Sequence, residues 1–180
     1  METKKELRRR MSALKRALPE DEARRLSARI MDAVEACPAF EKADTVLLYY
    51  SLPDEVHTHD FVSRWGNRKR ILLPVVIGDD LELRLYTGKD SLAPGPFGID
   101  EPQGEPFDDY AAIGFVGVPG VAFSHSGARL GRGKGFYDRL LPKLTNAYKA
   151  GICYPFQLIN EVPTEAFDIC MDEIITANEQ

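Results

Sequence analysis

Apolar residues near the N-terminus recur every three or four positions, which is the period of a helix with one buried face. Thr3 and Glu6 have the spacing of a capping box, so the first helix is expected to begin at Thr3. Pro19 and an acidic first turn predict the start of a second helix, and Cys37-Pro38 predicts its end. The two apolar stripes consist of Leu7, Met11, Leu14 and Leu18, followed by Ala23, Leu26, Ile30 and Val34.

Further along the chain, short apolar and β-branched runs replace the helical period and predict strands. Residues 81–86 alternate strictly between apolar and polar, which indicates an antiparallel strand with one wet face. Pro74 lies inside one run, and because proline cannot donate to a ladder it indicates a strand end or a sheet edge. The expected core strands are 45–50, 70–77, 113–118, 150–154 and 172–175.

This alternation of strands and helices predicts a three-layer α/β/α sandwich with a mainly parallel, Rossmann-like sheet. The 180 residues are enough for one domain with its own core, which we expect to span 1–180. The segment 91–107 is dense in proline and glycine, and we interpret it as a structured loop of that domain and not as a linker.

Composition narrows the classes of partner. The net charge of −5 (23 basic minus 28 acidic residues) disfavours a general nucleic-acid binder, so local basic clusters are expected to serve a small anion. Cys37, Cys153 and Cys170 are odd in number and form no CxxC pair, which indicates reduced thiols and a cytoplasmic protein. No apolar run approaches the length of a membrane span, and the charged N-terminus resembles no secretion signal, so we expect no membrane partner.

The most distinctive stretch, residues 118–144, places glycines at 127, 131, 133 and 135 between a strand and a short amphipathic helix. Arg129, Arg132 and Lys134 are interleaved with these glycines. Glycines let backbone N–H groups approach an anion, a helix start adds partial positive charge, and the cations can follow charge on a transferring phosphoryl group. The spacing fits neither the Walker pattern nor the dinucleotide fingerprint. A flexible surface loop with solvated charges is the alternative interpretation.

Several carboxylates and histidines are candidates for other roles. Asp138 leaves the basic loop as the helix begins, where it could hold Mg²⁺ against phosphates, although it could instead pair with Arg132 or Arg139. Glu55 follows the strand 45–50, so it either meets a ligand beyond the sheet edge or is an exposed loop carboxylate. His57 and His59 share one face of an extended segment, but a metal is not favoured there because no third ligand of that kind is near in sequence.

The residues GARLGRGKGFYDRLL, 127–141, resemble the signature loop of the 5-formyltetrahydrofolate cyclo-ligases, also called methenyltetrahydrofolate synthetases. Segments 4–8, 50–58 and 171–175 are similar to that family's basic first helix, folate-contacting segment and closing strand, in the same order. The resemblance implies ATP as co-substrate, Mg²⁺ as cofactor and 5-formyltetrahydrofolate as substrate. It also suggests 98–102 as a lid over the folate site.

The resemblance also distributes roles over the chain. For ATP it indicates Lys4, Lys5, Arg8, Arg129, Leu130, Gly131, Arg132, Gly133, Lys134, Gly135, Phe136 and Tyr137. For the folate it indicates Tyr50, Glu55, Phe136, Tyr137 and Tyr154, although Tyr154 and Phe156 fit core packing equally well. Asp138 and Asp172 are the expected Mg²⁺ ligands. Many relatives have tyrosine where this chain has Phe136.

The implied reaction is ATP-dependent closure of 5-formyltetrahydrofolate to 5,10-methenyltetrahydrofolate with release of ADP and phosphate. Phosphorylation of the formyl oxygen would make it a leaving group, and N10 would then attack the carbon, with Arg132 and Lys134 stabilising charge. Two alternatives remain open: a CoA-transferase-like or sugar-phosphate-isomerase-like enzyme using Glu55 or Glu101, and a non-catalytic folate- or nucleotide-binding module. We expect a monomer or weak homodimer.

Overall fold

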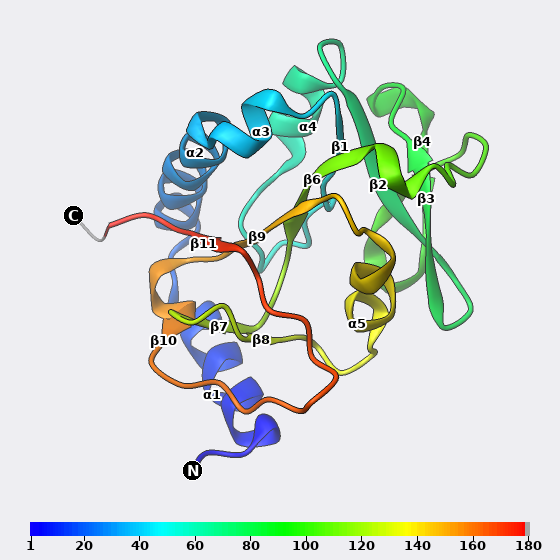
Figure 1. Ribbon diagram of the computed structural model, residues 1–180. Coiled ribbons are helices and arrows are strands. Elements are labelled where there is room, and N and C mark those ends of the chain that lie inside the picture. The colour runs from blue at the N-terminus through cyan, green and yellow to red at the C-terminus, as the bar shows by residue number, and fades with distance from the viewer. Residues whose placement is uncertain (179–180) are drawn as a thin grey trace.

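A six-stranded sheet forms the centre of the computed structural model, which describes residues 1–178 (Figure 1). The strands run in the order β11-β9-β6-β1-β2-β3, and all neighbours are parallel except β2 and β3. The mainly parallel α/β sheet predicted from the sequence is therefore confirmed. The strands are β1 (Thr45–Leu47), β2 (Arg70–Ile77), β3 (Asp80–Leu85), β6 (Ile113–Val118), β9 (Tyr148–Ile152) and β11 (Glu173–Ile175).

Helices cover both faces of this sheet. On one face lie α2 (Glu20–Ala36), α3 (Pro38–Lys42) and α4 (His59–Trp65), and on the other lie α5 (Phe136–Leu140) and the 3₁₀ turn η4 (Leu141–Lys143) (Figure 1). Successive strand residues face opposite layers: Val46 packs with the first group of helices and Leu47 with the second. The two cores that result are the sandwich expected from the run of buried strands.

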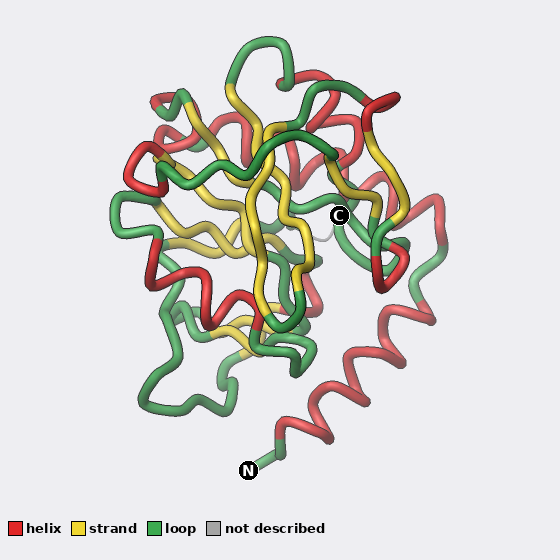
Figure 2. Tube along the Cα trace, turned by 90° about the vertical axis from the view of Figure 1, so that its right-hand side faces the viewer, coloured by secondary structure: helices red, strands yellow, loops and turns green. Residues whose placement is uncertain are grey.

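The first helix, α1 (Lys4–Ala17), begins with the predicted capping box of Thr3 and Glu6. It leads in from the N-terminus at the edge of the molecule (Figure 2) and buries Leu7 and Met11 against a small second sheet. Leu14 is 39% exposed, so the predicted stripe is wrong at that position. The second sheet joins β7 (Ala122–Ser124), β8 (Arg129–Leu130) and β10 (Leu158–Ile159) in the order β10-β7-β8.

The strand predicted at 45–50 ends three residues early. Beyond Leu47 the chain leaves the ladder, and the Thr58 hydroxyl donates to the Tyr49 carbonyl at 2.6 Å, which closes a loop over residues 49–58. Tyr49 and Tyr50 stay buried because they pack into the helical layer. Their apolar character reflects burial and not strand pairing, which is why the sequence pattern overestimated the strand.

The proline-rich segment 91–107 contains an antiparallel hairpin of β4 (Leu92–Pro94) and β5 (Asp100–Pro102), so the expectation of a structured loop is confirmed. β2 pairs with β1 only through its first three residues, and beyond Leu72 this side of β2 forms no strand ladder, although β5 lies near it. Pro74 lies in that stretch. Its lack of an N–H therefore removes no hydrogen bond from a ladder on that side of β2. Short 3₁₀ turns complete the chain at η1 (Lys89–Ser91), η2 (Pro96–Gly98), η3 (Tyr110–Ala112) and η5 (Pro155–Gln157).

All three cysteines carry unpaired thiols, with Cys37 and Cys153 buried and Cys170 exposed. Among the described residues, none of the helices combines the length and the apolar character that crossing a bilayer would require.

Candidate functional site

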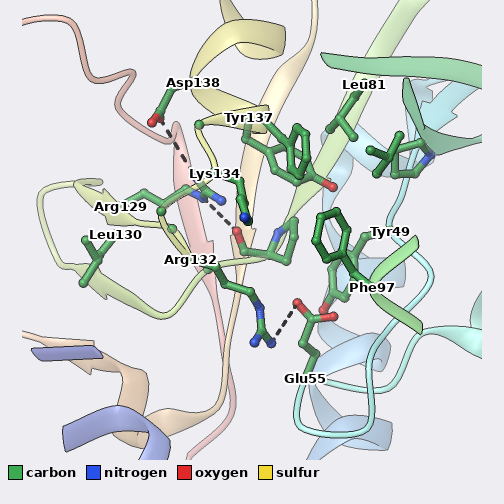
Figure 3. Close-up of a pocket in the computed structure, with 18 of the residues that line it drawn as sticks. Tyr49, Glu55, Leu81, Phe97, Arg129, Leu130, Arg132, Lys134, Tyr137 and Asp138 are labelled. Carbon is green, nitrogen blue, oxygen red and sulfur yellow. Dashed lines mark hydrogen bonds and ion pairs between the residues drawn. The ribbon is translucent and has the colours of Figure 1, made fainter. Parts of the chain in front are cut away.

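A pocket of about 550 Å³ opens where the carboxyl ends of the central strands meet the glycine loop (Figure 3). Most of its lining comes from four places: the loop after β1, the second half of β2, the hairpin β4–β5 and residues 129–138. The other lining residues are Lys4 and Arg8 of α1, Leu81 of β3, Pro119 and Gly120 after β6, and the late residues Phe167 and Asp168. Parallel strands expose their carboxyl ends at one edge, which is where α/β sheets place ligands.

The chain enters the glycine loop from a different element than the one expected from the sequence. The hairpin β7–β8 stands between strand β6 and Gly131, so the loop does not follow the core strand directly. Gly127 belongs to the turn of that hairpin, where an added Cβ would meet the Met171 carbonyl at 2.6 Å. Gly133 and Gly135 have φ of 108° and 74°, which glycine adopts without steric cost. These two glycines shape the loop itself.

The helix after the loop is shorter than its apolar residues suggested. α5 has five residues and passes into a 3₁₀ turn at Leu141-Pro142, because Pro142 has no N–H to donate to the carbonyl one helical turn back. Leu140, Leu141 and Leu144 are buried as expected. A helix of little more than one turn has a small dipole, so the side-chain cations carry most of the positive charge at this end.

Arg129 is a fixed part of the pocket wall. Its side chain is only 9% exposed, and its Nε donates to the Pro119 carbonyl at 2.7 Å. The guanidinium lies 5.1 Å from the centre of the Tyr137 ring and 3.8 Å from Asp138 Oδ1 (Figure 3). The ion-pair partner of Asp138 is therefore Arg129, and not Arg132 or Arg139 as the alternative interpretation supposed. Burial lowers the pKa of Arg129, which Tyr137 and Asp138 partly offset.

Arg132 bridges the glycine loop to the loop after β1. Its guanidinium donates to Asp54 Oδ1 at 2.8 Å. It also lies 3.7 Å from Glu55 Oε2 (Figure 3). Lys15 approaches Asp54 Oδ2 at 3.7 Å from α1, with a side chain only 7% exposed. Two carboxylates thus face two cations. Lys15 could not be singled out from the sequence, because it resembles the solvated basic residues around it on α1.

The pKa values of these neighbouring carboxyls shift in opposite directions. Burial raises the pKa of Glu55, and this outweighs the Leu52 N–H that it accepts at 2.8 Å and the nearby Arg132. Burial also acts on Asp54, but there Lys15 and Arg132 prevail and the pKa is lowered. Glu55, which lines the pocket, is therefore more readily protonated than an ordinary glutamate, and Asp54 beside it is less readily protonated than an ordinary aspartate.

The other cations near the glycine loop differ in the protein contacts that their side chains form. Arg8 Nε donates to the Gly131 carbonyl at 2.9 Å, which ties α1 to the glycine loop, and Lys4 pairs with Glu165 at 3.0 Å. Lys134 is exposed, and its ammonium lies 5.5 Å from the centre of the Phe97 ring. Within residues 1–178 Lys134 forms no ion pair. It is the cation of the loop best placed to meet a ligand.

This geometry agrees with a family match. The sequence model of the 5-formyltetrahydrofolate cyclo-ligase family matches residues 1–177. The chain belongs to the 5-formyltetrahydrofolate cyclo-ligase family.

Relatives and solved structures support the same membership. A probable 5-formyltetrahydrofolate cyclo-ligase of Schizosaccharomyces pombe is 31% identical over 83% of each chain. The 5-formyltetrahydrofolate cyclo-ligase of Escherichia coli is 29% identical over 90% of this chain and 93% of its own. The structure of Aquifex aeolicus 5,10-methenyltetrahydrofolate synthetase superposes with a TM-score of 0.86 at 37% identity, covering 96% of this chain and 89% of that one. The resemblance seen in the sequence is confirmed, and the chain is an enzyme of this family.

Most of the family residues inferred from the sequence lie together in the pocket. Three do not. Lys5 is exposed on α1 outside the pocket lining. Tyr154 is buried behind the loop after β1, where its hydroxyl lies 3.2 Å from Ser27 Oγ and donates to the Glu55 carbonyl at 3.1 Å. Asp172 accepts the backbone N–H of Lys149 at 2.8 Å and also lies outside the pocket lining.

These placements bear on the cofactor. Asp138 lines the pocket, and its side chain is 41% exposed, so it fits the single carboxylate that Mg²⁺ needs beside phosphate and water oxygens. Asp172 lies on the far side of β9 from β6 and does not line the same pocket as Asp138. Within residues 1–178 no three His, Cys, Asp or Glu side chains converge to hold an ion without help from a ligand. His59 instead stacks on Tyr50 at 3.7 Å.

The structure also adds pocket residues that sequence analysis did not assign. They are Tyr49, Leu52, Pro74, Val76, Leu81, Phe97, Pro119, Gly120, Phe167 and Asp168, together with Ile99 and Glu101 of the candidate lid segment. Most are apolar, and an apolar residue that lines a pocket has the same sequence signature as one in the core.

Proposed function

We propose that the chain catalyses the ATP- and Mg²⁺-dependent cyclisation of 5-formyltetrahydrofolate to 5,10-methenyltetrahydrofolate, releasing ADP and phosphate. The observation that carries this proposal is a single pocket with a cationic end at residues 129–135 and an apolar end at the hairpin β4–β5. A nucleoside triphosphate and a reduced pterin have these two complementary characters. Family membership supports the activity.

The chemistry requires the formyl oxygen to become a leaving group. In the proposed path this oxygen attacks the γ-phosphorus, and the bond from that phosphorus to ADP breaks. N10 then forms a bond to the formyl carbon, the carbon–oxygen bond breaks to release inorganic phosphate, and N10 loses its proton. The protein's task is to place the oxygen in line with the γ-phosphate and to stabilise charge.

Three side chains take the charge-stabilising roles. Lys134 and Arg132 are proposed to contact the transferring phosphoryl group, and Asp138 is proposed to hold Mg²⁺, which neutralises phosphate charge when bound. Arg132 is paired with Asp54 and Glu55 in this structure, so phosphate binding would replace a carboxylate partner with a phosphate partner. The carboxylate of Glu55 would then be available to N–H groups of the folate.

Absorbance at the methenyl band tests the activity. The purified chain with 5-formyltetrahydrofolate, ATP and Mg²⁺ should produce the band, and omission of any one component should abolish it. ATP-independent turnover would instead indicate an isomerase- or transferase-type reaction, and ligand binding without turnover would indicate a binding module.

Unpaired thiols at all three cysteines support the further proposal of a cytoplasmic location.

Oxygen labelling tests the path. Substrate carrying heavy oxygen in the formyl group should give labelled inorganic phosphate, because the formyl oxygen leaves bonded to phosphorus. Mass spectrometry of the released phosphate measures this directly. Label found only in water would exclude the phosphorylated intermediate.

A further inference from the structure

Glu101 is a buried carboxylate at the apolar end of the pocket. The residue lies on β5, is 7% exposed and lines the pocket. Its Oε2 accepts the backbone N–H of Val76 at 2.8 Å, on the side of β2 that forms no strand ladder. Buried carboxylates are costly unless they are paired, so a single backbone donor leaves this one under-satisfied.

The second oxygen of Glu101 has no protein partner. Among residues 1–178 no donor reaches Oε1, and no lysine or arginine forms an ion pair with the carboxylate. The fully enclosed side-chain atoms without a partner in this part of the chain are Trp65 Nε1 and Thr176 Oγ1, so Glu101 Oε1 retains access. Because the residue is otherwise buried and lines the pocket, that access is to the pocket.

The backbone of the hairpin is shaped around this carboxylate. Gly95 has an ordinary extended φ of −112°, so its glycine is not needed for the backbone conformation. An added Cβ there would lie 2.4 Å from Glu101 Cδ and 2.5 Å from Oε1. Glycine at position 95 therefore leaves the space in which the carboxyl group sits.

The walls beside Glu101 favour a flat ring. Apolar side chains surround it from β2, β3, the hairpin and the start of α5: Pro74, Val76, Leu81, Phe97, Ile99 and Phe136. Phe97 has a φ of 63°, rare for a residue with a side chain; the residue is 55% exposed, and the centre of its ring is 6.1 Å from that of Phe136. Strain of this kind persists where the surroundings hold it, often at ligand sites. Figure 3 shows Phe97 facing the pocket across from Tyr137.

We propose that Glu101 is a specificity-determining residue that accepts hydrogen bonds from the N–H groups of a flat heteroaromatic ring held in this apolar slot. The inference rests on the proposed function, under which the ring is the reduced pterin. Its pyrimidine edge carries a ring N–H and an exocyclic amine, and both are donors. A carboxylate that is already placed and desolvated selects for such an edge, because an analogue without donors would leave the charge unpaired.

Glu101 could otherwise serve only to fasten the hairpin to β2 through Val76. Glu101→Gln separates the two roles, because glutamine keeps an acceptor for the Val76 N–H but replaces the charge and turns a donor toward the ligand. Gly95→Ala is a second variant that keeps the charge and displaces the carboxyl group. Asp100→Asn is the matched control, because Asp100 is an exposed carboxylate on the same strand outside the pocket lining.

The test is calorimetric binding of 5-formyltetrahydrofolate without nucleotide, together with the KM values for folate and ATP. We expect Glu101→Gln to weaken folate binding by at least about tenfold, the scale of a hydrogen bond to a charged group, and to leave the KM for ATP within about twofold. Gly95→Ala should weaken folate binding in the same direction. Asp100→Asn should bind as the wild type does.

A folate analogue that lacks the exocyclic amine completes the test. The wild-type chain should bind this analogue more weakly than the natural folate, and Glu101→Gln should discriminate between them much less. If Glu101→Gln loses the same factor for both ligands, Glu101 only fastens the hairpin and the proposal is overturned. Unchanged folate binding in Glu101→Gln also overturns it. Absence of methenyl product with the wild-type chain would refute the proposed function alone, because the binding comparison does not depend on turnover.

Discussion

The two ends of the pocket are built on opposite principles. At the cationic end, most charged side chains already have protein partners: Arg129 has Pro119 and Asp138, and Arg132 has Asp54 and Glu55. At the apolar end, side chains of β2, β3 and the hairpin form walls around one carboxylate that has a single backbone donor. A ligand at the first end must exchange partners with the protein, whereas a ligand at the second end supplies what is missing.

We propose that this difference separates catalysis from recognition. Exchange of one ion-pair partner for another gives little net affinity, but it is well suited to interactions that strengthen only as charge moves in the transition state. Burial of a flat ring and completion of an unpaired carboxylate contribute affinity before any chemistry occurs. Variants at the cationic end should therefore lower kcat, and variants at the apolar end should raise the KM for folate.

The largest expected effect is at the glycine loop. Arg132→Ala and Lys134→Ala should each lower kcat by at least about a hundredfold, the scale seen when one donor to a developing charge is removed. Steady-state kinetics on purified protein measures this. The control is Arg25→Ala, which removes an exposed arginine paired with Glu22 on α2. Near-wild-type kcat in both loop variants would mean that this end only binds nucleotide.

How well each end could be predicted follows from the nature of its signal. The glycine loop was visible in the sequence because glycines and cations alternate locally, and local spacing is what a sequence displays. The parallel sheet was visible for the same reason, through continuous apolar runs such as 113–118. The buried pair of Lys15 with Asp54 and the contact of Glu101 with Val76 were not predicted, because both join residues that are distant in the sequence.

The errors in the secondary-structure prediction have physical causes too. Tyr49 and Tyr50 are buried outside any ladder, so an apolar run overestimated β1. Pro142 shortens α5 although its leucines keep the helical spacing. The hairpin β7–β8 was not foreseen, because its strands of three and two residues are too short to show a period.

The second prediction concerns the metal, and it sharpens the picture of the cationic end. Asp138→Asn should raise the Mg²⁺ concentration for half-maximal activity by roughly tenfold, since a neutral amide is a weaker ligand for a hard cation. Asp172→Asn is the comparison, and we expect it to leave the Mg²⁺ titration near that of the wild type because Asp172 lies outside the pocket lining. Equal shifts in both variants would make Asp172 a ligand as well.

A third prediction tests whether Lys15 of α1 positions the charged side chains at the cationic end. Lys15→Met removes the buried ammonium beside Asp54 at similar side-chain length, which should let Asp54 and Arg132 reorient. We expect kcat to fall by roughly threefold to tenfold with little change in the KM for folate, on the scale of a positioning contact. Lys15→Arg should restore most of the loss, and failure of that rescue together with a lowered melting temperature would indicate a purely structural role.

The smallest expected effects are on the free energy of unfolding. They compare the neighbouring carboxyls of Glu55 and Asp54, whose pKa values shift in opposite directions. Burial raises the pKa of Glu55 above its ordinary 4.5, so the folded state binds the proton more readily than the unfolded state. Ionised Glu55 therefore lowers the stability of the folded state at pH values above its folded-state pKa. This loss of stability disappears as the pH falls below 4.5. Glu55→Gln should raise the free energy of unfolding at pH 8 by no more than about 1 kcal/mol.

For substitution of Asp54 we expect a change in the free energy of unfolding of the opposite sign. Lys15 and Arg132 outweigh its burial and lower its pKa, so its stabilisation is present above the ordinary 3.8 and is lost as the pH falls through the lower folded value. Asp54→Asn should therefore destabilise the chain at pH 8, and its difference from the wild type should vanish only in strong acid. Urea unfolding of both variants from pH 3 to pH 8 measures the two differences. If they share a sign at pH 8, Arg132 does not favour Asp54 over Glu55, and the exchange of partners proposed for the cationic end would have to begin from a different pairing.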